Sequence, residues 1–269
     1  MKELGEDSPH LESKYSRKTW IVIGTVTVVL AILCIAVMII LVETRPAPSP
    51  PQILDVYVSP EHPTSSDEII VTAHVVSESS SYVSVRIRYC SYFDGSGSGG
   101  RGMLSVGNDL YAARLTEHGR IFRDGTEVWF VVTASIGYGE TVISESFTFQ
   151  VGDVLRNGSS GLNILQVAHN PEEPTSEDSV FVTASVYSNA EISHVTLGYM
   201  QIRSLGGGGG GGSMRYQSGD NYSGDIRGHG PGGLMEVGFV EGTVILYRVA
   251  AKDETGNTAV SNVYTFTIS

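Results

Sequence analysis

The chain has 269 residues, with 17 basic and 29 acidic side chains and a formal net charge of −12. This length suggests one or two domains, and the acidic balance argues against a nucleic-acid-binding protein, which normally carries a basic patch. Two cysteines cannot build a disulfide scaffold, and the 32 glycines lack the three-residue period of collagen.

An uncharged apolar run, W-I-V-I-G-T-V-T-V-V-L-A-I-L-C-I-A-V-M-I-I-L-V, occupies residues 20–42. As a helix that rises about 1.5 Å per residue, it is long enough to cross the roughly 30 Å hydrocarbon core of a bilayer. Most basic residues near the run precede it, namely Lys2, Lys14, Arg17 and Lys18. By the positive-inside rule, residues 1–19 form a cytoplasmic tail and the C-terminal part is extracellular. We therefore expect a single-pass protein anchored in the lipid bilayer of the cell membrane.

Two other interpretations of this run fit less well. A cleaved signal peptide has an apolar core of about 7–15 residues and a small-x-small exit, whereas this core is longer and its exit reads E-T-R-P-A-P. A type IV pilin helix follows a short basic leader that ends in a small residue, and bacterial pilins carry an early glutamate; neither feature is present. After the run, residues 43–52 form a proline-rich stalk that favours extended polyproline II structure.

The remainder of the chain is a duplication. One copy opens at Ile53 with I-L-D-V-Y-V-S-P-E-H-P-T-S-S-D-E-I-I-V-T-A, and the other opens at Ile164 with I-L-Q-V-A-H-N-P-E-E-P-T-S-E-D-S-V-F-V-T-A. The copies match at an offset of 111 in their first parts and of 117 in their last parts, so the second copy has gained six residues. We expect two related domains, residues 53–151 and 164–269, joined by a linker at residues 152–163.

Both copies consist of short stretches rich in β-branched residues. In residues 83–89, valine, isoleucine and tyrosine alternate with serine and arginine, which places Arg86 and Arg88 on the face opposite the apolar side chains. About seven such stretches per copy of about 100 residues predict an antiparallel β-sandwich. We expect Trp129 and Leu246 at equivalent positions near the centres of the two sandwiches. The predicted strands are 53–58, 69–76, 82–90, 101–106, 109–115, 127–135 and 143–151, followed by 164–168, 180–187, 192–203, 213–217, 221–226, 243–251 and 260–268.

The copies share the pattern V-x-x-x-P-x-x-P-T-S-x-D-x-V-x-V-T-A and a late tyrosine, and the second copy ends in A-x-D-x-x-G-N-T at residues 251–258. This pattern resembles immunoglobulin-like or fibronectin type III-like modules, in particular the tandem modules of membrane-anchored surface proteins of archaea and bacteria. The first copy departs from the A-x-D-x-x-G-N-T ending. A Cys…Trp…Cys pattern is missing, so an antibody-type domain is excluded. The implied fold is all-β, with two tandem antiparallel β-sandwich domains preceded by one N-terminal transmembrane α-helix.

The sequence indicates no catalytic, cofactor-binding or metal site. Its histidines are scattered without a zinc spacing, no G-x-S-x-G occurs, and no glycine-rich segment ends in G-K-[ST]. Asp67, Asp178 and the D-E-T-G-N run at residues 253–257 offer carboxylates that could hold Ca²⁺, but we interpret them as turn and capping residues. We therefore expect a protein that is not an enzyme and carries no cofactor.

Two glycine-rich segments, residues 95–102 and 206–212, follow the third strand of each copy. We interpret both as flexible loops that connect the two sheets of a sandwich. Loops at one end of a sandwich often form binding surfaces, so the neighbouring side chains are candidate contacts for a partner. These residues are Tyr92, Phe93, Arg101, Met214, Arg215 and Tyr216.

Two acceptor motifs for N-glycans occur in the predicted extracellular part, N-G-S at Asn157 and N-Y-S at Asn221. Asn157 lies in the linker and is the better candidate. Cys90 is the only cysteine of this part, so no disulfide is expected within it.

The sequence therefore predicts a single-pass surface protein whose two modules serve as non-catalytic stalk, adhesion or protein-interaction units. The partner would be a protein or a glycan, and nucleic acid is not expected. The alternative is an accessory or structural subunit of an envelope or filament assembly, pilin-like in being anchored by its N-terminal helix. The first 45 residues carry five basic and five acidic side chains, so the net charge belongs entirely to the extracellular part.

Overall fold

The computed structural model describes residues 28, 30–37, 49–78, 82–92, 98–116, 122–137, 141–152, 161–203, 207–227 and 239–269. The chain divides into two compact units, Met1–Ala47 and Pro48–Ser269. In the first unit, residues 30–37 are helical. Among the described residues, none of the helical structure is both long and apolar enough to cross a bilayer. The cytoplasmic tail, most of the predicted span at residues 20–42 and most of the stalk lie outside the described residues.

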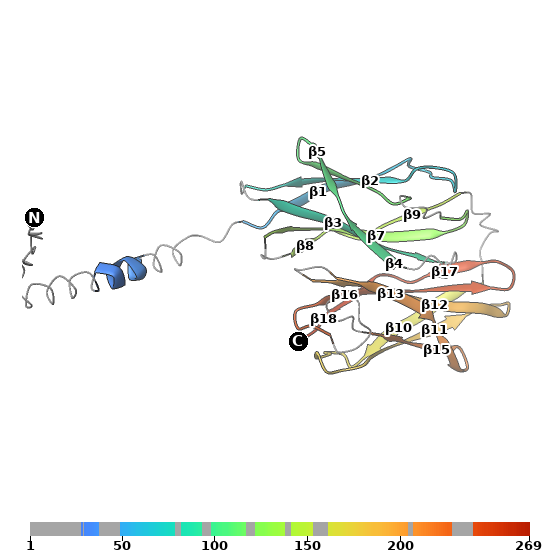
Figure 1. Ribbon diagram of the computed structural model, residues 1–269. Coiled ribbons are helices and arrows are strands. Elements are labelled where there is room, and N and C mark those ends of the chain that lie inside the picture. Colours follow the sequence, from blue (N-terminus) through green and yellow to red (C-terminus); the bar gives the residue numbers. More distant parts are fainter. Residues whose placement is uncertain are drawn as a thin grey trace, which may run out of the picture. The chain divides into compact units, whose positions relative to one another are not determined.

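The first copy folds into two antiparallel sheets (Figure 1). One sheet has the strand order β1-β2-β6-β5, and the other has the order β4-β3-β7-β8 with β9 also paired to β7. The strands are β1 (Gln52–Ser59), β2 (Ile70–Val76), β3 (Val83–Tyr92), β4 (Ser98–Gly102), β5 (Leu104–Gly107), β6 (Leu110–Arg114), β7 (Glu127–Ile136), β8 (Thr141–Ile143) and β9 (Phe147–Gln150).

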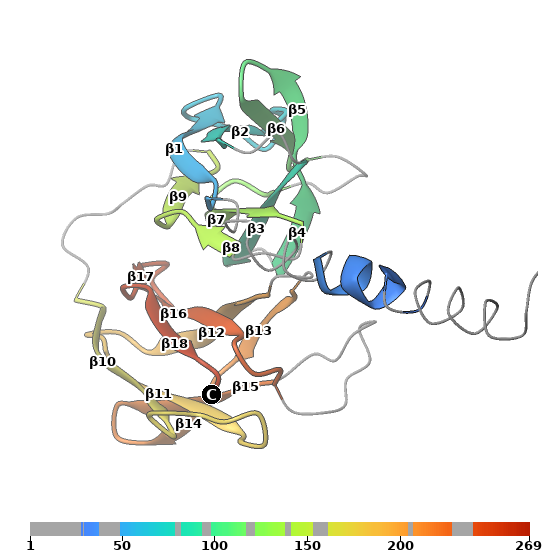
Figure 2. The same ribbon diagram turned by 90° about the vertical axis from the view of Figure 1, so that its left-hand side faces the viewer.

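The second copy repeats this topology (Figure 2). Its sheets have the orders β10-β11-β15-β14 and β13-β12-β16-β17, with β18 also paired to β16. The prediction of an all-β chain built from antiparallel sandwiches is therefore confirmed for both copies. The strands are β10 (Asn163–Asn170), β11 (Val180–Tyr187), β12 (Ile192–Ile202), β13 (Gly209–Ser213), β14 (Arg215–Ser218), β15 (Asn221–Ile226), β16 (Val244–Asp253), β17 (Thr258–Val260) and β18 (Tyr264–Thr267).

Each sandwich has its own hydrophobic core, because alternate side chains of the facing strands point inward. In the first copy, Val71, Ala73 and Val75 of β2 face Ile87 of β3 and Phe130 of β7 in one cluster. The corresponding cluster of the second copy contains side chains of β11, β12 and β16 in the same arrangement. The repeated sequence pattern thus produces the same core twice.

Four predicted strands are each divided in two. Residues 101–106 and 213–217 span a switch between sheets, at Met103 and Met214, where the chain leaves an edge of one sheet and joins the other. The Met103 N–H donates to the Val85 carbonyl at 2.8 Å, and the Met214 N–H donates to the Val195 carbonyl at 2.7 Å. Both methionine side chains are buried, and their packing holds the chain in place where it crosses between the sheets. The last predicted strand of each copy is likewise two strands, β8 and β9, and β17 and β18.

The prediction of flexible glycine-rich loops is wrong for the parts of both segments that form strands. Ser98–Gly102 is strand β4, paired with β3, and Gly209–Ser213 is strand β13, paired with β12. Close packing against tyrosine explains the glycines. A Cβ atom on Gly99 would lie 2.6 Å from the Tyr89 ring, and one on Gly210 would lie 2.5 Å from the Tyr199 hydroxyl.

Candidate interaction site at the junction of the two sandwiches

A third hydrophobic cluster lies outside both sandwich cores. Its buried members come from both copies and are Cys90, Tyr92, Trp129, Val131, Met200, Ile202, Leu246 and Ala250. Trp129 and Leu246 are therefore equivalent, as predicted, but the prediction that they lie near the sandwich centres is wrong. Side chains alternate along a strand, so the neighbours Val128 and Phe130 fill the core and Trp129 points outward. We call this cluster the junction cluster.

Arg248 of β16 extends the junction cluster with polar contacts. Its guanidinium Nη1 lies 3.5 Å from the Glu127 carboxylate and donates a hydrogen bond to the Thr148 hydroxyl at 3.1 Å. Its guanidinium carbon lies 5.9 Å from the centre of the Trp129 ring, within the range of a cation–π interaction. One side chain of the second copy thereby contacts β7 and β9 of the first copy.

Arg88 of β3 makes a second polar contact across the junction. The side chain is buried, and its Nη1 donates to the Gly207 carbonyl at 2.8 Å. Burial, together with the neighbouring charges of Arg86 and Arg203, lowers the pKa of Arg88 to about 10. The guanidinium remains charged at neutral pH. Arg86, on the same face of β3, is exposed.

Cys90 is a free thiol at the centre of the junction. Its Sγ–H donates to the Tyr199 carbonyl at 3.4 Å. Burial raises the pKa of the Cys90 thiol, and the thiol is the less reactive form of cysteine. The residue acts here as a small apolar side chain.

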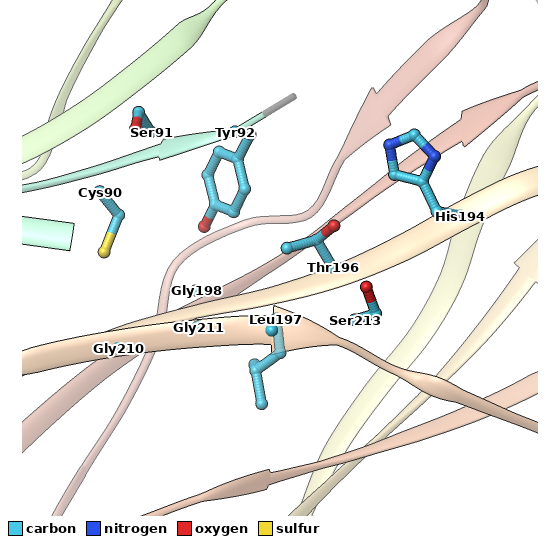
Figure 3. A pocket seen from close by; sticks show the side chains of 11 residues that line it. Cys90, Ser91, Tyr92, His194, Thr196, Leu197, Gly198, Gly210, Gly211 and Ser213 are labelled. Atoms are coloured by element: carbon cyan, nitrogen blue, oxygen red, sulfur yellow. The ribbon is translucent and has the colours of Figure 1, made fainter. Parts of the chain in front are cut away.

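A cavity of about 340 Å³ opens beside the junction cluster. Figure 3 shows Tyr92 reaching toward β12, while His194, Thr196 and Ser213 point to the same side of the sheet and Leu197 points away. Residues that line the cavity include Ser91, Tyr92, Thr196, Gly198, Gly211 and Ser213. Residues of both copies thus form a single recess, with side chains from each and exposed glycine backbone from the second copy.

The predicted contact residues do not gather in one loop surface. Tyr92 lies in β3 and is buried, and Met214 is buried in the core of the second sandwich. Arg101 is a half-buried residue of β4. Arg215 and Tyr216 are exposed on β14, where the Tyr216 ring meets the Tyr222 ring edge to face. Phe93 lies outside the described residues, as does the candidate glycosylation residue Asn157, whereas Asn221 is exposed at the start of β15.

The junction was not predicted, because alternation within one sandwich does not show which other surface covers its outer face. The sequence does contain a signal of this junction. The residues of β7 read E-V-W-F-V-V-T-A-S-I, a nearly continuous apolar run in which every residue after the first is buried. Such a run indicates a strand that is covered on both faces. The matching strand β16 also has buried apolar residues on both faces, interrupted by Arg248 and Lys252.

The acidic residues considered as Ca²⁺ ligands cap turns. The carboxylate of Asp67 accepts hydrogen bonds from the Thr64 N–H and hydroxyl at 2.7 and 2.8 Å, and Asp178 makes the same pair of bonds with Thr175. These backbone and side-chain bonds lower the pKa of both carboxyl groups.

Asp253 closes the turn between β16 and β17. Its carboxylate accepts bonds from the backbone and side chains of Thr255 and Asn257 and from the Ser188 hydroxyl. Burial opposes ionisation, but these bonds outweigh it and lower the pKa of Asp253 to about 2. In the described part of the chain, no cluster of three or more histidine, cysteine or acidic residues is placed to hold a metal ion.

No protein-family model and no curated protein matches the chain. Among solved structures, it is similar to the crystal structure of the FN1–FN3 domains of chicken CNTN1, with 12% sequence identity and a TM-score of 0.30. The match covers 83% of this chain and 67% of the other.

Proposed function

We propose that this chain is a non-catalytic, membrane-anchored surface protein whose two fibronectin type III-like sandwiches act together as one protein-interaction unit. The observation that carries the proposal is the junction cluster. Burying eight apolar side chains between the copies joins them into one larger platform, which suits recognition better than a flexible string of spacers does. The charge-free run at residues 20–42 supports the anchor.

The anchor and the topology are tested together on intact cells. The full chain carries one epitope tag at each end, and an external protease is added. We expect the protease to remove the C-terminal tag and leave the N-terminal tag with the cells. Resistance of the C-terminal tag in intact cells, or recovery of the whole chain in the soluble fraction, would contradict the proposal.

A pair of variants sharpens this test. Leu33→Arg places a charge in the middle of the run, where it opposes insertion by about 2.5–3.5 kcal/mol, and is expected to reduce the membrane-bound fraction. Cys34→Ser, at the neighbouring position, keeps the run uncharged and is expected to stay in the membrane fraction. Equal distribution of both variants would contradict the anchor. Co-purification of the tagged chain with one stable membrane partner would favour the accessory-subunit alternative.

A further inference from the structure

We propose that the outer edge of β13 binds an extended peptide, which adds a strand to the sheet and directs an arginine side chain into the neighbouring cavity. This inference rests on the proposed role in protein interaction, and it names the chemistry of the partner. It is carried by three observations: the open backbone groups of β13, the side of the sheet on which the cavity lies, and the difference between the two copies.

The first observation is that β13 is an edge strand, which pairs within the described residues with β12 alone. Two backbone hydrogen bonds to β12 mark the ends of its ladder. The Met214 N–H donates to the Val195 carbonyl, and the Gln201 N–H donates to the Gly208 carbonyl. In an antiparallel ladder every second residue directs its backbone groups to the partner strand, and the residues between direct theirs away. The residues of β13 that direct N–H and C=O groups toward the open edge are Gly209, Gly211 and Ser213.

This edge lacks the usual protection against pairing. Edge strands of natural proteins commonly carry charged side chains, prolines or bulges that prevent the addition of another strand. Here Gly211, Gly212 and Ser213 are exposed and present almost no side chain. The first copy has Arg101 at the position that corresponds to Gly212. A Cβ atom on Gly209 would lie 3.0 Å from Ser98, so the accessible part of the edge runs from Gly211 to Ser213.

The second observation is that the cavity lies on the correct side of this edge. Gly211 pairs with Gly198 and Ser213 pairs with Thr196, and all four residues line the cavity. Directly opposed residues of neighbouring strands point to the same face of a sheet. Residues of an added strand that lie opposite Gly211 and Ser213 would therefore form the backbone bonds and also point their side chains into the cavity.

The third observation comes from the duplication. Tyr89 pairs with Phe130 and Tyr199 pairs with Tyr247 at corresponding places, so position 198 of β12 corresponds to position 88 of β3. At position 88 an arginine fills its side of the junction and donates to a backbone carbonyl, whereas the glycine at position 198 makes room for the Tyr92 ring, and the cavity lies beside that contact.

In the first copy a guanidinium group is thus accommodated on the junction side of the sheet by a hydrogen bond to a backbone carbonyl. The hydroxyl groups of Thr196 and Ser213 can accept hydrogen bonds from a guanidinium group. The net charge of −12 favours the approach of a basic peptide over an acidic one.

The test uses the full chain in detergent and a labelled peptide, acetyl-T-V-T-V-R-V-T-V-T-amide, whose binding is followed by fluorescence anisotropy. Two further peptides carry N-methyl groups on the odd-numbered or the even-numbered residues. Only one set of amides can face β13, so one methylated peptide should bind at least about tenfold more weakly and the other should bind as the parent does. Replacing the arginine by alanine should also weaken binding by about tenfold.

Protein variants locate the site on the chain. Ser213→Pro removes an N–H group that points away from β12, so the existing ladder is kept while peptide binding should weaken by about tenfold. Ser213→Ala retains this N–H group and loses only the hydroxyl group, so it should weaken binding less than Ser213→Pro does. Thr196→Arg places an arginine at the position that corresponds to Arg86 of the first copy. Its side chain should fill the cavity and abolish binding. Thermal unfolding of each variant verifies that the fold is retained.

Three results would overturn the proposal: no saturable binding up to about 1 mM peptide, equal weakening by both methylation patterns, or unchanged binding by Ser213→Pro. The measurement in detergent does not depend on membrane topology. Its failure would therefore remove the β13 site, whereas the protease experiment on cells would still decide the proposed function.

Discussion

Tyr92 of β3 packs so tightly against Gly198 of β12 that a Cβ atom at position 198 would lie 2.7 Å from the Tyr92 hydroxyl oxygen. The two residues belong to different copies of the duplicated unit, and Tyr92 is buried. No larger residue fits at position 198 without movement of its neighbours. The close approach of the two sandwiches at this point therefore depends on a glycine at position 198.

Gly198→Ala is therefore expected to weaken the junction. Overpacking of a tight contact costs about 1–3 kcal/mol, and urea unfolding should show this loss in the free energy of unfolding. Gly212→Ala is the matched control, because nothing lies within 4 Å of a Cβ atom at that position. An equal loss in both variants would mean that a general effect of removing a glycine from the sheet, and not the contact with Tyr92, determines stability.

The contact between Arg248 and Glu127 should stabilise the junction measurably. Their side chains are only 12% and 17% exposed, so solvent screens the pair much less than it screens a surface ion pair. Hydrogen bonds to charged groups contribute about 1.5–3 kcal/mol, and Arg248→Met should lose an amount in this range. A double-mutant cycle with Glu127→Gln, followed by urea unfolding, measures the interaction itself. Additive losses of the two variants would contradict a direct interaction.

Cys90 provides a chemical measure of how often the junction opens. Because its thiol is buried and its pKa is raised, alkylation of Cys90 in folded protein should be slow and should become fast in denaturant. The experiment uses Cys34→Ser, which leaves Cys90 as the single thiol, and follows iodoacetamide labelling by mass spectrometry. Adding Gly198→Ala should accelerate labelling, whereas adding Gly212→Ala should not. Rapid labelling of the folded Cys34→Ser chain would show that the junction is not closed in solution.

Asp253 should make stability depend on pH in the acidic range. Its folded-state pKa of about 2 lies below the ordinary value for a free aspartate, so the ionised carboxylate stabilises the folded chain at neutral pH. This contribution should be lost as the pH falls from about 5 toward 2. Asp253→Asn should be less stable than the parent at pH 7, and the difference in urea midpoint should shrink as the pH is lowered. A constant difference across this range would contradict the proposed role of the charge.

The strands and their inward faces could be predicted because each copy repeats local signals. Alternation placed Val85, Ile87 and Tyr89 on one face of β3, and β3 has this arrangement. The capping function of Asp67 was also predictable, because the aspartate lies three residues after the threonine whose N–H it binds. These features depend on residues close together in the chain or on a period of two, and both can be recognised without coordinates.

The glycine-rich segments show where local signals mislead. Glycine is typical of flexible loops, but in Ser98–Gly102 and Gly209–Ser213 the glycines allow a tyrosine of the neighbouring strand to pack closely. Only the pairing of β4 with β3 and of β13 with β12 distinguishes the two explanations.

The amino-acid sequence by itself thus determined that this protein contains two β-sandwiches of one design, because strand alternation and internal repetition are properties of a single chain segment. Tertiary structure alone decided that Trp129, Arg248 and Cys90 belong to a junction between the copies. The physical reason is that an apolar side chain on the outer face of a strand requires a cover, and the sequence does not state which distant surface provides it.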